Sequence, residues 1–555
     1  MARQRYFSDY GRASARPSEA HVVPYLAVAV LALIGLLLMR LSPPPVTAIH
    51  ITGRVLDGYT GQPIAGARVA VLAAGPDQPT PGNSRPAVAI TQPVTVAGVM
   101  TNTAAAAPAS LLQTITAADG SWTFGDLVAQ DPLLLIEQTG YDAQQVVTAG
   151  RAGDLEVRLQ PNTLHGTVTN AAGHPVAGAT VAGGGQVTTT ASDGTYLLSN
   201  IGTDHHLMVK APGYTLVRTE FANTTQQNVA LKDPFNARAI YVNADSLAAP
   251  GKLLNLIKLA NDTEINAMVI DVKADTTGFV LYNSALPQVQ AAGASNPVVG
   301  DLRGLIDSLH KNGIYVIARQ ALFWDEKLAA AHPEWAIHSK SSGTPWVDAY
   351  GHHWVNAYRP EVWAYNIAIA KEVGSLGADE VQFDYVRFPS DGNLADTDYG
   401  VPDSQPKAGA ISSFLAQAYT ELSREGVFVS ADVFGLSPIV KDDLGIGQQF
   451  DELVKHVDYI SPMAYPSHYA NGFLGFDKPA EHPSEVLAYT LHDSLAKMLR
   501  SNARLRPWLQ DFTLGGVVYD ASRVRGQIEV CEANDTAGWM LWNFDNVYTQ
   551  DALKK

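Results

Sequence analysis

Acidic and basic side chains follow apolar runs at several points in the C-terminal half of the chain. Asp384 and Arg387 lie in the stretch from Glu380 to Pro389, whose phenylalanines and valines favour a strand and whose proline ends strand pairing. One buried aspartate is usually a hydrogen-bonding residue of the fold. Carboxylates at the same end of successive strands are hard to explain by folding alone, because unpaired buried charge is costly. Such a set favours proton-transfer chemistry in a shared cleft.

The other candidate residues share this position at or just beyond the end of a predicted strand. They are Asp271, Lys273, Arg319, Trp324, Asp432, Tyr465, Asp511 and Trp542. Aromatic side chains stack on the apolar faces of sugar rings, while carboxylates bind hydroxyl groups. Converging on one mouth, these residues predict an acidic, aromatic-lined cleft. Histidines between 332 and 353 have no strong metal-ligand spacing, so we expect no metal and no cofactor.

The elements that must position these residues are strands that alternate with helical stretches from residue 237 onward. This alternation predicts a parallel sheet. The eight predicted strands are Ala237–Asn243, Ala267–Lys273, Tyr315–Phe323, Glu380–Phe388, Phe428–Phe434, Tyr459–Tyr465, Leu505–Phe512 and Gly538–Phe544. Eight strands over about 320 residues favour an α/β fold, a (β/α)8 TIM barrel, over residues 234–555. An open doubly wound sheet is the alternative, but the glycine-rich first turn that it needs is missing.

Two segments before the barrel, 49–160 and 161–232, carry the same sequence pattern. Gly61-Gln-Pro-Ile-Ala-Gly-Ala-Arg-Val69 in the first corresponds to Gly173-His-Pro-Val-Ala-Gly-Ala-Thr-Val181 in the second. Short strands with Gly, Pro and Asp-Gly turns predict small all-β sandwiches. Both segments resemble the carboxypeptidase regulatory-like module, which is transthyretin-like. An Ala/Pro/Thr-rich insertion, residues 73–113, interrupts the first. We expect the two segments to act as spacers between the membrane and the barrel, and glycan binding is the alternative role.

The N-terminus predicts a membrane anchor. Residues 1–21 form a basic tail, and residues 22–41 include an apolar run that as a helix would approach the thickness of a bilayer core. Positive charge before this run places the tail in the cytoplasm and the bulk of the chain outside the cell, in a single-pass protein of the cell membrane. A cleaved signal peptide is the alternative, and it also exports the remainder.

Composition excludes several classes of protein and of site. The net charge of −16 argues against a nucleic-acid partner, which would favour a basic face. Cys531 is the single cysteine, so neither an intramolecular disulfide nor a cysteine-rich metal site can form. At 555 residues the chain is long enough for several domains.

Four motifs of the C-terminal half resemble a known family. They are Val381-Gln-Phe-Asp-Tyr-Val-Arg-Phe-Pro389, His332-Pro-Glu-Trp335, Ala431-Asp-Val-Phe434 and Ser461-Pro-Met-Ala-Tyr-Pro466. They are similar to the family named putative glycosyl hydrolase domain, or domain of unknown function 4015, over about residues 236–550. The resemblance implies a TIM barrel that is related to glycoside hydrolases and acts on a poly- or oligosaccharide.

Glycoside hydrolysis uses two carboxyl groups, of which one must hold a proton near neutral pH. We expect Asp384 to be the nucleophile or ionised partner, with Arg319 or Arg387 beside it. Arg387 would face the mouth only if the strand ends near Tyr385, because its spacing from Asp384 puts it on the opposite face of a regular strand.

The residues leave two candidates for the general acid, Asp432 and Asp511. The resemblance to α-amylase-like barrels implies a nucleophilic aspartate on strand 4 and an acid on strand 5. This chain has Asp432 there instead of glutamate, so Asp511 stays open as the acid or a third carboxylate. Asp271, Lys273, Arg319, Trp324, Arg387, Tyr465 and Trp542 are expected to bind substrate. The alternatives are a catalytically inactive polysaccharide-binding surface protein and a structural surface protein.

Overall fold

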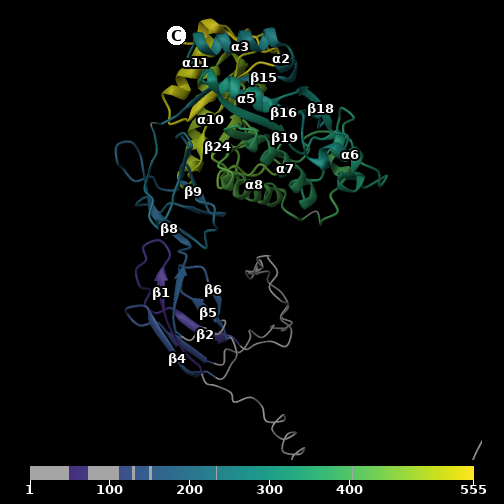
Figure 1. Cartoon of the computed structure of the whole chain (residues 1–555). Coiled ribbons are helices and arrows are strands. Elements are labelled where there is room, and N and C mark those ends of the chain that lie inside the picture. Colours follow the sequence, from purple (N-terminus) through teal and green to yellow (C-terminus); the bar gives the residue numbers. More distant parts are fainter. Residues whose placement is uncertain (1–48, 73–111, 128–131, 149–152, 233, 403) are drawn as a thin grey trace, which may run out of the picture. The chain divides into compact units, whose positions relative to one another are not determined.

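A computed structural model describes residues 49–72, 112–127, 132–148, 153–232, 234–402 and 404–555 (Figure 1). By internal contacts the chain divides into two units, Met1–Gln160 and Pro161–Lys555. Each unit is described by itself below.

The C-terminal part of the second unit is a closed barrel of eight parallel strands, which confirms the predicted fold. The barrel closes because β15 pairs in parallel with both β16 and β27. Around the barrel, in sequence order, the strands are β15 (Ala237–Val242), β16 (Ala267–Lys273), β19 (Tyr315–Ala321), β21 (Glu380–Asp384), β23 (Phe428–Phe434), β24 (Tyr459–Met463), β26 (Trp508–Gln510) and β27 (Gly538–Trp542).

Helices alternate with these strands and cover the outside of the barrel (Figure 1). Their apolar faces pack with the outward-facing strand residues in one large core, whereas inward-facing residues such as Ala239 and Tyr241 form a separate cluster inside the barrel. The helices are α2 (Ala244–Ala248), α3 (Pro250–Asp262), α4 (Pro287–Ala291), α5 (Leu302–Lys311), α6 (Glu326–Ala331), α7 (Pro360–Ser375), α8 (Lys407–Arg424), α9 (Phe450–Leu453), α10 (Pro483–Met498) and α11 (Ala521–Glu532).

Short strands extend the barrel sheet or tie down its long connections. An excursion after β16 contributes two strands to the sheet, and a two-stranded ribbon fixes the connection after β19. A further short strand pairs with β24. These strands are β17 (Val280–Tyr282), β18 (Ser295–Val299), β20 (His338–Ser339), β22 (Thr397–Asp398) and β25 (Arg504–Leu505).

Five of the predicted barrel strands are longer than the observed ones, and a sixth is interrupted. The strand predicted to run to Phe388 ends at Asp384, and the one predicted to run to Tyr465 ends at Met463. The strand predicted at Leu505–Phe512 is divided between β25 and β26. The strands predicted at Ala267–Lys273 and Phe428–Phe434 have the predicted bounds. Apolar composition continues past several strand ends because the first loop residues are themselves buried.

The two β-rich segments have the same strand order. In the first unit, sheet β4-β1-β7 accompanies sheet β3-β2-β5-β6; in the second unit, β11-β8-β14 accompanies β10-β9-β12-β13. The first set is β1 (Ile49–Asp57), β2 (Arg68–Leu72), β3 (Leu112–Ile115), β4 (Ser121–Leu127), β5 (Leu133–Glu137), β6 (Gln144–Val147) and β7 (Gly153–Leu159). The second is β8 (Thr163–Thr169), β9 (Thr180–Gly183), β10 (Gln186–Thr189), β11 (Thr195–Ser199), β12 (His206–Lys210), β13 (Val217–Glu220) and β14 (Val229–Ala230).

Each pair of sheets encloses its own apolar core. The predicted insertion, 73–113, includes Leu112 and Gln113, which the structure places in β3. Its remaining residues lie outside the described part of the chain.

The second β-segment, residues 161–232, contacts the N-terminal ends of the barrel strands. The buried Lys210 ammonium lies 2.6 Å from the buried Asp458 carboxylate and donates a hydrogen bond to the Val427 carbonyl. The Gly213 amide donates to the Tyr459 hydroxyl at the first residue of β24. These contacts cover the barrel end that lies opposite the C-terminal ends of its strands.

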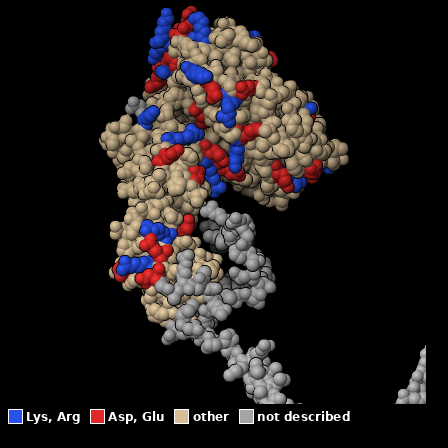
Figure 2. Space-filling view, in the orientation of Figure 1, with Lys and Arg blue, Asp and Glu red and all other residues tan. Residues whose placement is uncertain are grey.

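On the face of the barrel drawn in Figure 2, Lys and Arg lie among Asp and Glu. None of the helices in the described ranges is long and apolar enough to cross a membrane. The predicted basic tail and anchor, residues 1–21 and 22–41, lie outside those ranges.

Candidate active site

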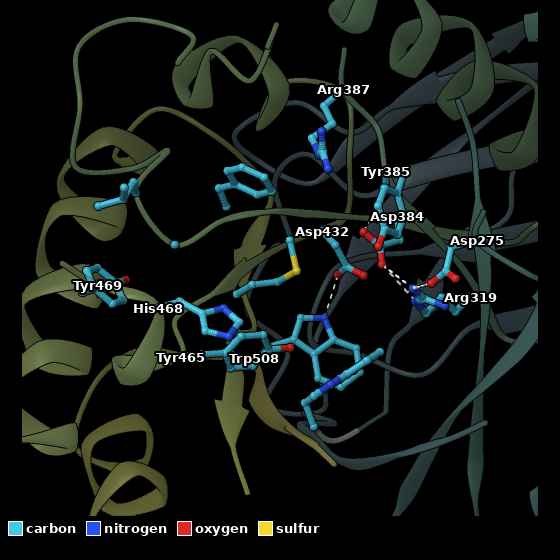
Figure 3. Close-up of a pocket in the computed structure, with 15 residues that line it drawn as sticks. Asp275, Arg319, Asp384, Tyr385, Arg387, Asp432, Tyr465, His468, Tyr469 and Trp508 are labelled. Atoms are coloured by element: carbon cyan, nitrogen blue, oxygen red, sulfur yellow. Dashed lines mark hydrogen bonds and ion pairs between the residues drawn. The ribbon is translucent and has the colours of Figure 1, made fainter. Parts of the chain in front are cut away.

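A pocket of about 470 Å³ opens at the C-terminal ends of the barrel strands (Figure 3). This is the end at which the sequence places its carboxylates and where TIM barrels carry their sites. Six of the ten predicted site residues line it: Arg319, Asp384, Arg387, Asp432, Tyr465 and Trp542.

Arg319 lies at the centre of a group of carboxyl side chains in one wall of the pocket. It projects from β19, is 2% exposed, and contacts carboxylates from two neighbouring strands and one loop. Its guanidinium lies 2.7 Å from Asp271, 3.0 Å from Asp275 and 2.6 Å from Asp384. The three carboxyl groups around this one guanidinium fix the arginine in place.

Asp384 is the last residue of β21 and points into the barrel. Inward-facing positions of this strand are polar, since Glu380 and Gln382 precede Asp384 at a spacing of two, while Val381 and Phe383 pack outward against the helices. The Oδ2 atom of Asp384 accepts hydrogen bonds from Nε and Nη2 of Arg319 at 3.0 and 2.6 Å. These two hydrogen bonds fix the position of the Asp384 carboxylate in the pocket wall.

The backbone turns sharply after Asp384. Tyr385 has a φ of 50°, in the left-handed region that residues other than glycine seldom adopt, and its amide donates to Oδ1 of Asp384 at 2.6 Å. The turn ends the strand and sends Arg387 back to the mouth, where it lines the pocket. The condition on which the sequence made this placement depend, a strand ending near Tyr385, is therefore met.

Asp432 lies beside Asp384 in the same pocket and has a different environment (Figure 3). It projects from β23, is 1% exposed, and accepts one hydrogen bond, from the Trp508 indole at 2.8 Å. Its Oδ2 atom is buried without a hydrogen-bond partner in the described structure. Burial, and then the neighbouring charge of Asp384, raise the pKa of Asp432 well above its ordinary value, so that this carboxyl retains its proton more readily.

Aromatic side chains form the remaining walls. The Trp542 ring stacks on Tyr241 with a centroid distance of 4.1 Å, and Trp508 meets Trp542 edge to face. Tyr465 packs edge to face against His468, which also lines the pocket. Flat apolar faces next to carboxylates suit a sugar ring, as the sequence predicted.

Four predicted site residues do not line the pocket. Asp271 lies just behind it, where its carboxylate accepts from the Tyr241 hydroxyl at 2.5 Å and contacts Arg319. Trp324 packs on the outer side of the Tyr385 and Trp354 rings, at centroid distances of 4.9 and 5.7 Å. Both support residues of the site without facing the cavity.

Lys273 points away from the pocket, into the layer between strands and helices. Its ammonium lies 2.8 Å from Asp325 and donates to the Ala321 carbonyl and the Asn366 side chain. The register between β16 and β19 shifts between Asp271 and Lys273, which removes the regular alternation and turns Lys273 outward. Lys273 is therefore not among the residues that line the pocket.

Asp511 is also held elsewhere. Its two carboxylate oxygens accept hydrogen bonds from the amide and hydroxyl of Thr549, and it fixes the segment after β27. Burial raises the pKa of Asp511, but the residue is not part of the pocket wall.

Several lining residues lie outside the predicted set. Asp275 follows β16 in a loop, where no strand pattern indicates its direction. Trp508 lies two residues before Gln510 on β26, and inward alternation from that residue could have found it. Met463, Tyr469 and Phe434 add apolar surface. Among the described residues, no three His, Cys, Asp or Glu side chains are grouped as ligands for a metal ion.

Solved structures that match part of this chain include a hypothetical protein from Ruminiclostridium thermocellum, 35% identical over 35% of this chain and 97% of that chain, with a TM-score of 0.32. The PgaB (BpsB) glycoside hydrolase domain from Bordetella bronchiseptica is 15% identical over 56% of this chain and 95% of that chain, with a TM-score of 0.42. The glycoside hydrolase domain of PelA from Pseudomonas aeruginosa is 11% identical over 55% and 94%, with a TM-score of 0.32.

A comparison with curated proteins finds no match. Family models match two segments of the chain. Residues 163–233 match the carboxypeptidase regulatory-like domain. Residues 239–548, more than half of the chain and all of the barrel strands that form the pocket, match the model described as putative glycosyl hydrolase domain. This chain belongs to that glycosyl hydrolase domain family.

Proposed function

We propose that this protein hydrolyses glycosidic bonds of a poly- or oligosaccharide with Asp384 and Asp432 as its pair of carboxyl groups. The observation that carries the proposal is the contrast between the two environments in one pocket. Arg319 contacts Asp384 at 2.6 Å, whereas Asp432 has a raised pKa and, within the described part of the chain, no basic side chain at ion-pair distance. Glycosidases need this division between an ionised and a protonated carboxyl group.

In this mechanism Asp432 donates its proton to the oxygen of the leaving group as the bond from that oxygen to the anomeric carbon breaks. Asp384 either forms a covalent bond to that carbon, which a water deprotonated by Asp432 then hydrolyses, or takes the proton of a water that attacks the carbon directly. The Asp384 carboxylate also stabilises the positive charge that develops on the sugar ring in the transition state. The Tyr465, Trp508 and Trp542 side chains, which line the same cavity, bind the ring faces and hydroxyls. Asp511 is not needed as an acid because Asp432 supplies that group within the pocket.

We extend the proposal to the rest of the chain. Residues 22–41 anchor the protein in the cell membrane, with the β-segments and the barrel on the extracellular side. The support is the apolar sequence and the basic tail before it. The β-segments act as spacers, because the second of them covers the barrel end remote from the pocket.

The alternative, a catalytically inactive polysaccharide-binding protein, rested on the weak match of aspartate at strand 5. The raised pKa of Asp432 weakens this objection, since a shorter side chain in a buried position can still supply a proton. Both functions predict glycan binding, so only a measurement of glycan cleavage distinguishes them.

The test is a reducing-sugar assay of the full-length chain against α-linked glucans, bacterial exopolysaccharides and peptidoglycan. Asp384→Asn should lower kcat by at least about 10³-fold, because it removes the nucleophile or base that attacks the sugar carbon and the negative charge that stabilises the transition state. The melting temperature should change by only a few degrees, since asparagine retains the shape and can still accept from Arg319.

Asp511→Asn is the matched control, because it also removes a buried aspartate at a strand end but lies outside the pocket. It should keep most of the activity, whereas Asp432→Asn should not. Full activity of Asp384→Asn would refute the assignment. Saturable glycan binding with no turnover by the wild type would support the alternative.

A further inference from the structure

Arg387 differs from every other buried cation of the described structure. Lys210, Lys273, Arg319 and Arg506 each lie within 3.0 Å of a carboxylate oxygen. Arg387 is 7% exposed, and no carboxylate of the described residues lies within ion-pair distance of it; Asp384, Asp391 and Asp348 act on its charge from further away. A buried charge without a counter-charge in direct contact is costly, and sites keep such a charge where a ligand supplies the contact.

The guanidinium is held in one orientation by its surroundings. It lies over the rings of Trp354, Phe434 and Tyr385, with distances of 5.0, 4.8 and 5.3 Å to the ring centroids. Its Nη1 atom donates to the Phe388 carbonyl at 3.0 Å and to the Ser390 hydroxyl at 3.2 Å. These contacts fix the plane of the group before any ligand arrives.

The other nitrogens of Arg387 remain available to a ligand. Nε and Nη2 donate no hydrogen bond to any described residue, and neither is among the buried atoms that lack a partner, so both reach the cavity. Figure 3 shows the side chain directed into the pocket, on a different side of it from Arg319. A planar pair of N–H donors matches the two oxygens of a carboxylate or a sulfate ester.

We propose that Arg387 binds an anionic substituent of the sugar, so that the substrate of this pocket is an acidic glycan bearing carboxylate or sulfate groups. The proposal rests on the hydrolase function proposed above and names its substrate class. A neutral hydroxyl would not require a buried charge, because an amide side chain would bind it without the cost of burying a cation. The Asp384 and Asp275 carboxylates, which line the same pocket, disfavour an anion beside them, so the position of Arg387 also sets the orientation of the ring.

The experiment compares matched polysaccharides with the full-length chain. Uronic-acid polymers are assayed beside their carboxyl-reduced forms, and sulfated polymers beside their desulfated forms, which separates the two sources of negative charge. We expect kcat/KM for one acidic form to exceed that of its neutral counterpart by about tenfold or more, as a charge-assisted bidentate contact allows. Arg387→Gln should reduce this ratio at least about tenfold.

Arg387→Lys retains the charge but loses the planar pair of donors, so it should give an intermediate ratio and guards against a folding defect in the glutamine variant. Arg303→Gln is the control for net charge, because Arg303 is exposed and donates to the Ser375 carbonyl on the barrel surface. It should leave the ratio unchanged. A wild-type preference for the neutral forms, or the same ratio in Arg387→Gln, would overturn the proposal.

Binding to the Asp384→Asn variant separates this inference from the hydrolase function. Isothermal titration with acidic oligosaccharides should show saturable binding that Arg387→Gln in the same background weakens at least about tenfold. Such binding without turnover by the wild type would refute the hydrolase function and support acidic recognition. Cleavage of neutral glycans with no preference for acidic ones would support the hydrolase function and refute acidic recognition. If acidic glycans were neither bound nor cleaved, the inference would be refuted.

Discussion

At the scale of single residues, the proposed chemistry depends on how Asp432 holds its proton. Burial and the neighbouring Asp384 raise the pKa of Asp432, while the hydrogen bond from the Trp508 indole lowers it. A general acid works only in its protonated form, so kcat/KM should fall as the pH rises through this pKa. The alkaline limb of the pH profile therefore reports on Asp432.

Replacing Trp508 with phenylalanine tests this assignment. The change removes a donor that stabilises the carboxylate, so the pKa of Asp432 should rise further and the alkaline limb should move to higher pH by roughly one unit. The measurement is the pH dependence of kcat/KM. Trp542→Phe is the matched control, because it removes an indole from the same pocket that does not bind Asp432. An alkaline limb that stays in place in Trp508→Phe, or moves equally in both variants, would contradict the acid role.

Residue type and position at a strand end were enough to predict that Asp384 and Asp432 line one pocket. Two facts were beyond the sequence. The raised pKa of Asp432 depends on burial and on the charge of Asp384 from the neighbouring strand, which no local pattern reveals. Asp275 enters the pocket from a loop, where alternation gives no direction. Neither the burial of Asp432 nor the neighbouring charge of Asp384 can be read from the residues within one strand.

At the scale of elements, the end of β21 decides whether the site is complete. Left-handed backbone at Tyr385 ends the strand and turns Arg387 into the pocket. Such a conformation costs roughly 1–2 kcal/mol for most residues, more for β-branched ones and less for asparagine. The strain is thus located at the site that it shapes.

Paired substitutions at Tyr385 separate the backbone from the ring. Valine and asparagine both remove the aromatic contacts with Trp324 and Arg387, but asparagine tolerates the left-handed region and valine does not. Tyr385→Val should therefore lower the free energy of unfolding by roughly 1–2 kcal/mol relative to Tyr385→Asn and should show the lower activity. Urea denaturation and kcat/KM measure the two effects. Equal stability of the variants would mean that the turn does not depend on this conformation.

The sequence predicted which elements form more reliably than it predicted where they end. Periodicity indicated eight parallel strands and their order along the chain. It could not indicate the register shift after Asp271, which turns Lys273 toward Asp325 and away from the cavity. A shift of this kind depends on pairing with β19, about fifty residues further along the chain, so a pattern read within one strand places Lys273 on the wrong side.

At the scale of the whole molecule, the second β-segment and the barrel share a buried interface. Lys210 and Asp458 are both fully buried, and Phe428 and Tyr459 at the start of β23 and β24 pack together with Leu216 from the β-segment. The sequence placed a domain boundary between residues 232 and 234, where the pattern changes from alternating strands to strands and helices. Composition reveals that change but not the ion pair across it, because the two partners lie far apart in the sequence.

Removing the ammonium of Lys210 should show how much this interface contributes. Lys210→Met leaves Asp458 buried without its counter-charge, so the free energy of unfolding should fall by about 3–5 kcal/mol. Lys258→Met is the matched control, since Lys258 pairs with Asp262 on the exposed surface of α3, where such a pair contributes about 0–1 kcal/mol. Chemical denaturation followed by circular dichroism gives both values. KM should stay unchanged in both variants, because the interface lies at the barrel end opposite the pocket.

Truncation tests the same interface without a point substitution. A fragment of residues 161–555 retains Lys210 and should unfold cooperatively, whereas a fragment of residues 234–555 exposes Phe428 and Tyr459 and leaves Asp458 unpaired. The shorter fragment should therefore melt at a lower temperature or aggregate, because both the apolar surface and the ion pair are lost. Thermal unfolding measures the melting temperatures of the two fragments, and light scattering measures their aggregation. Equal melting temperatures, together with a Lys210→Met cost no greater than that of Lys258→Met, would show that the barrel folds independently of the segment before it.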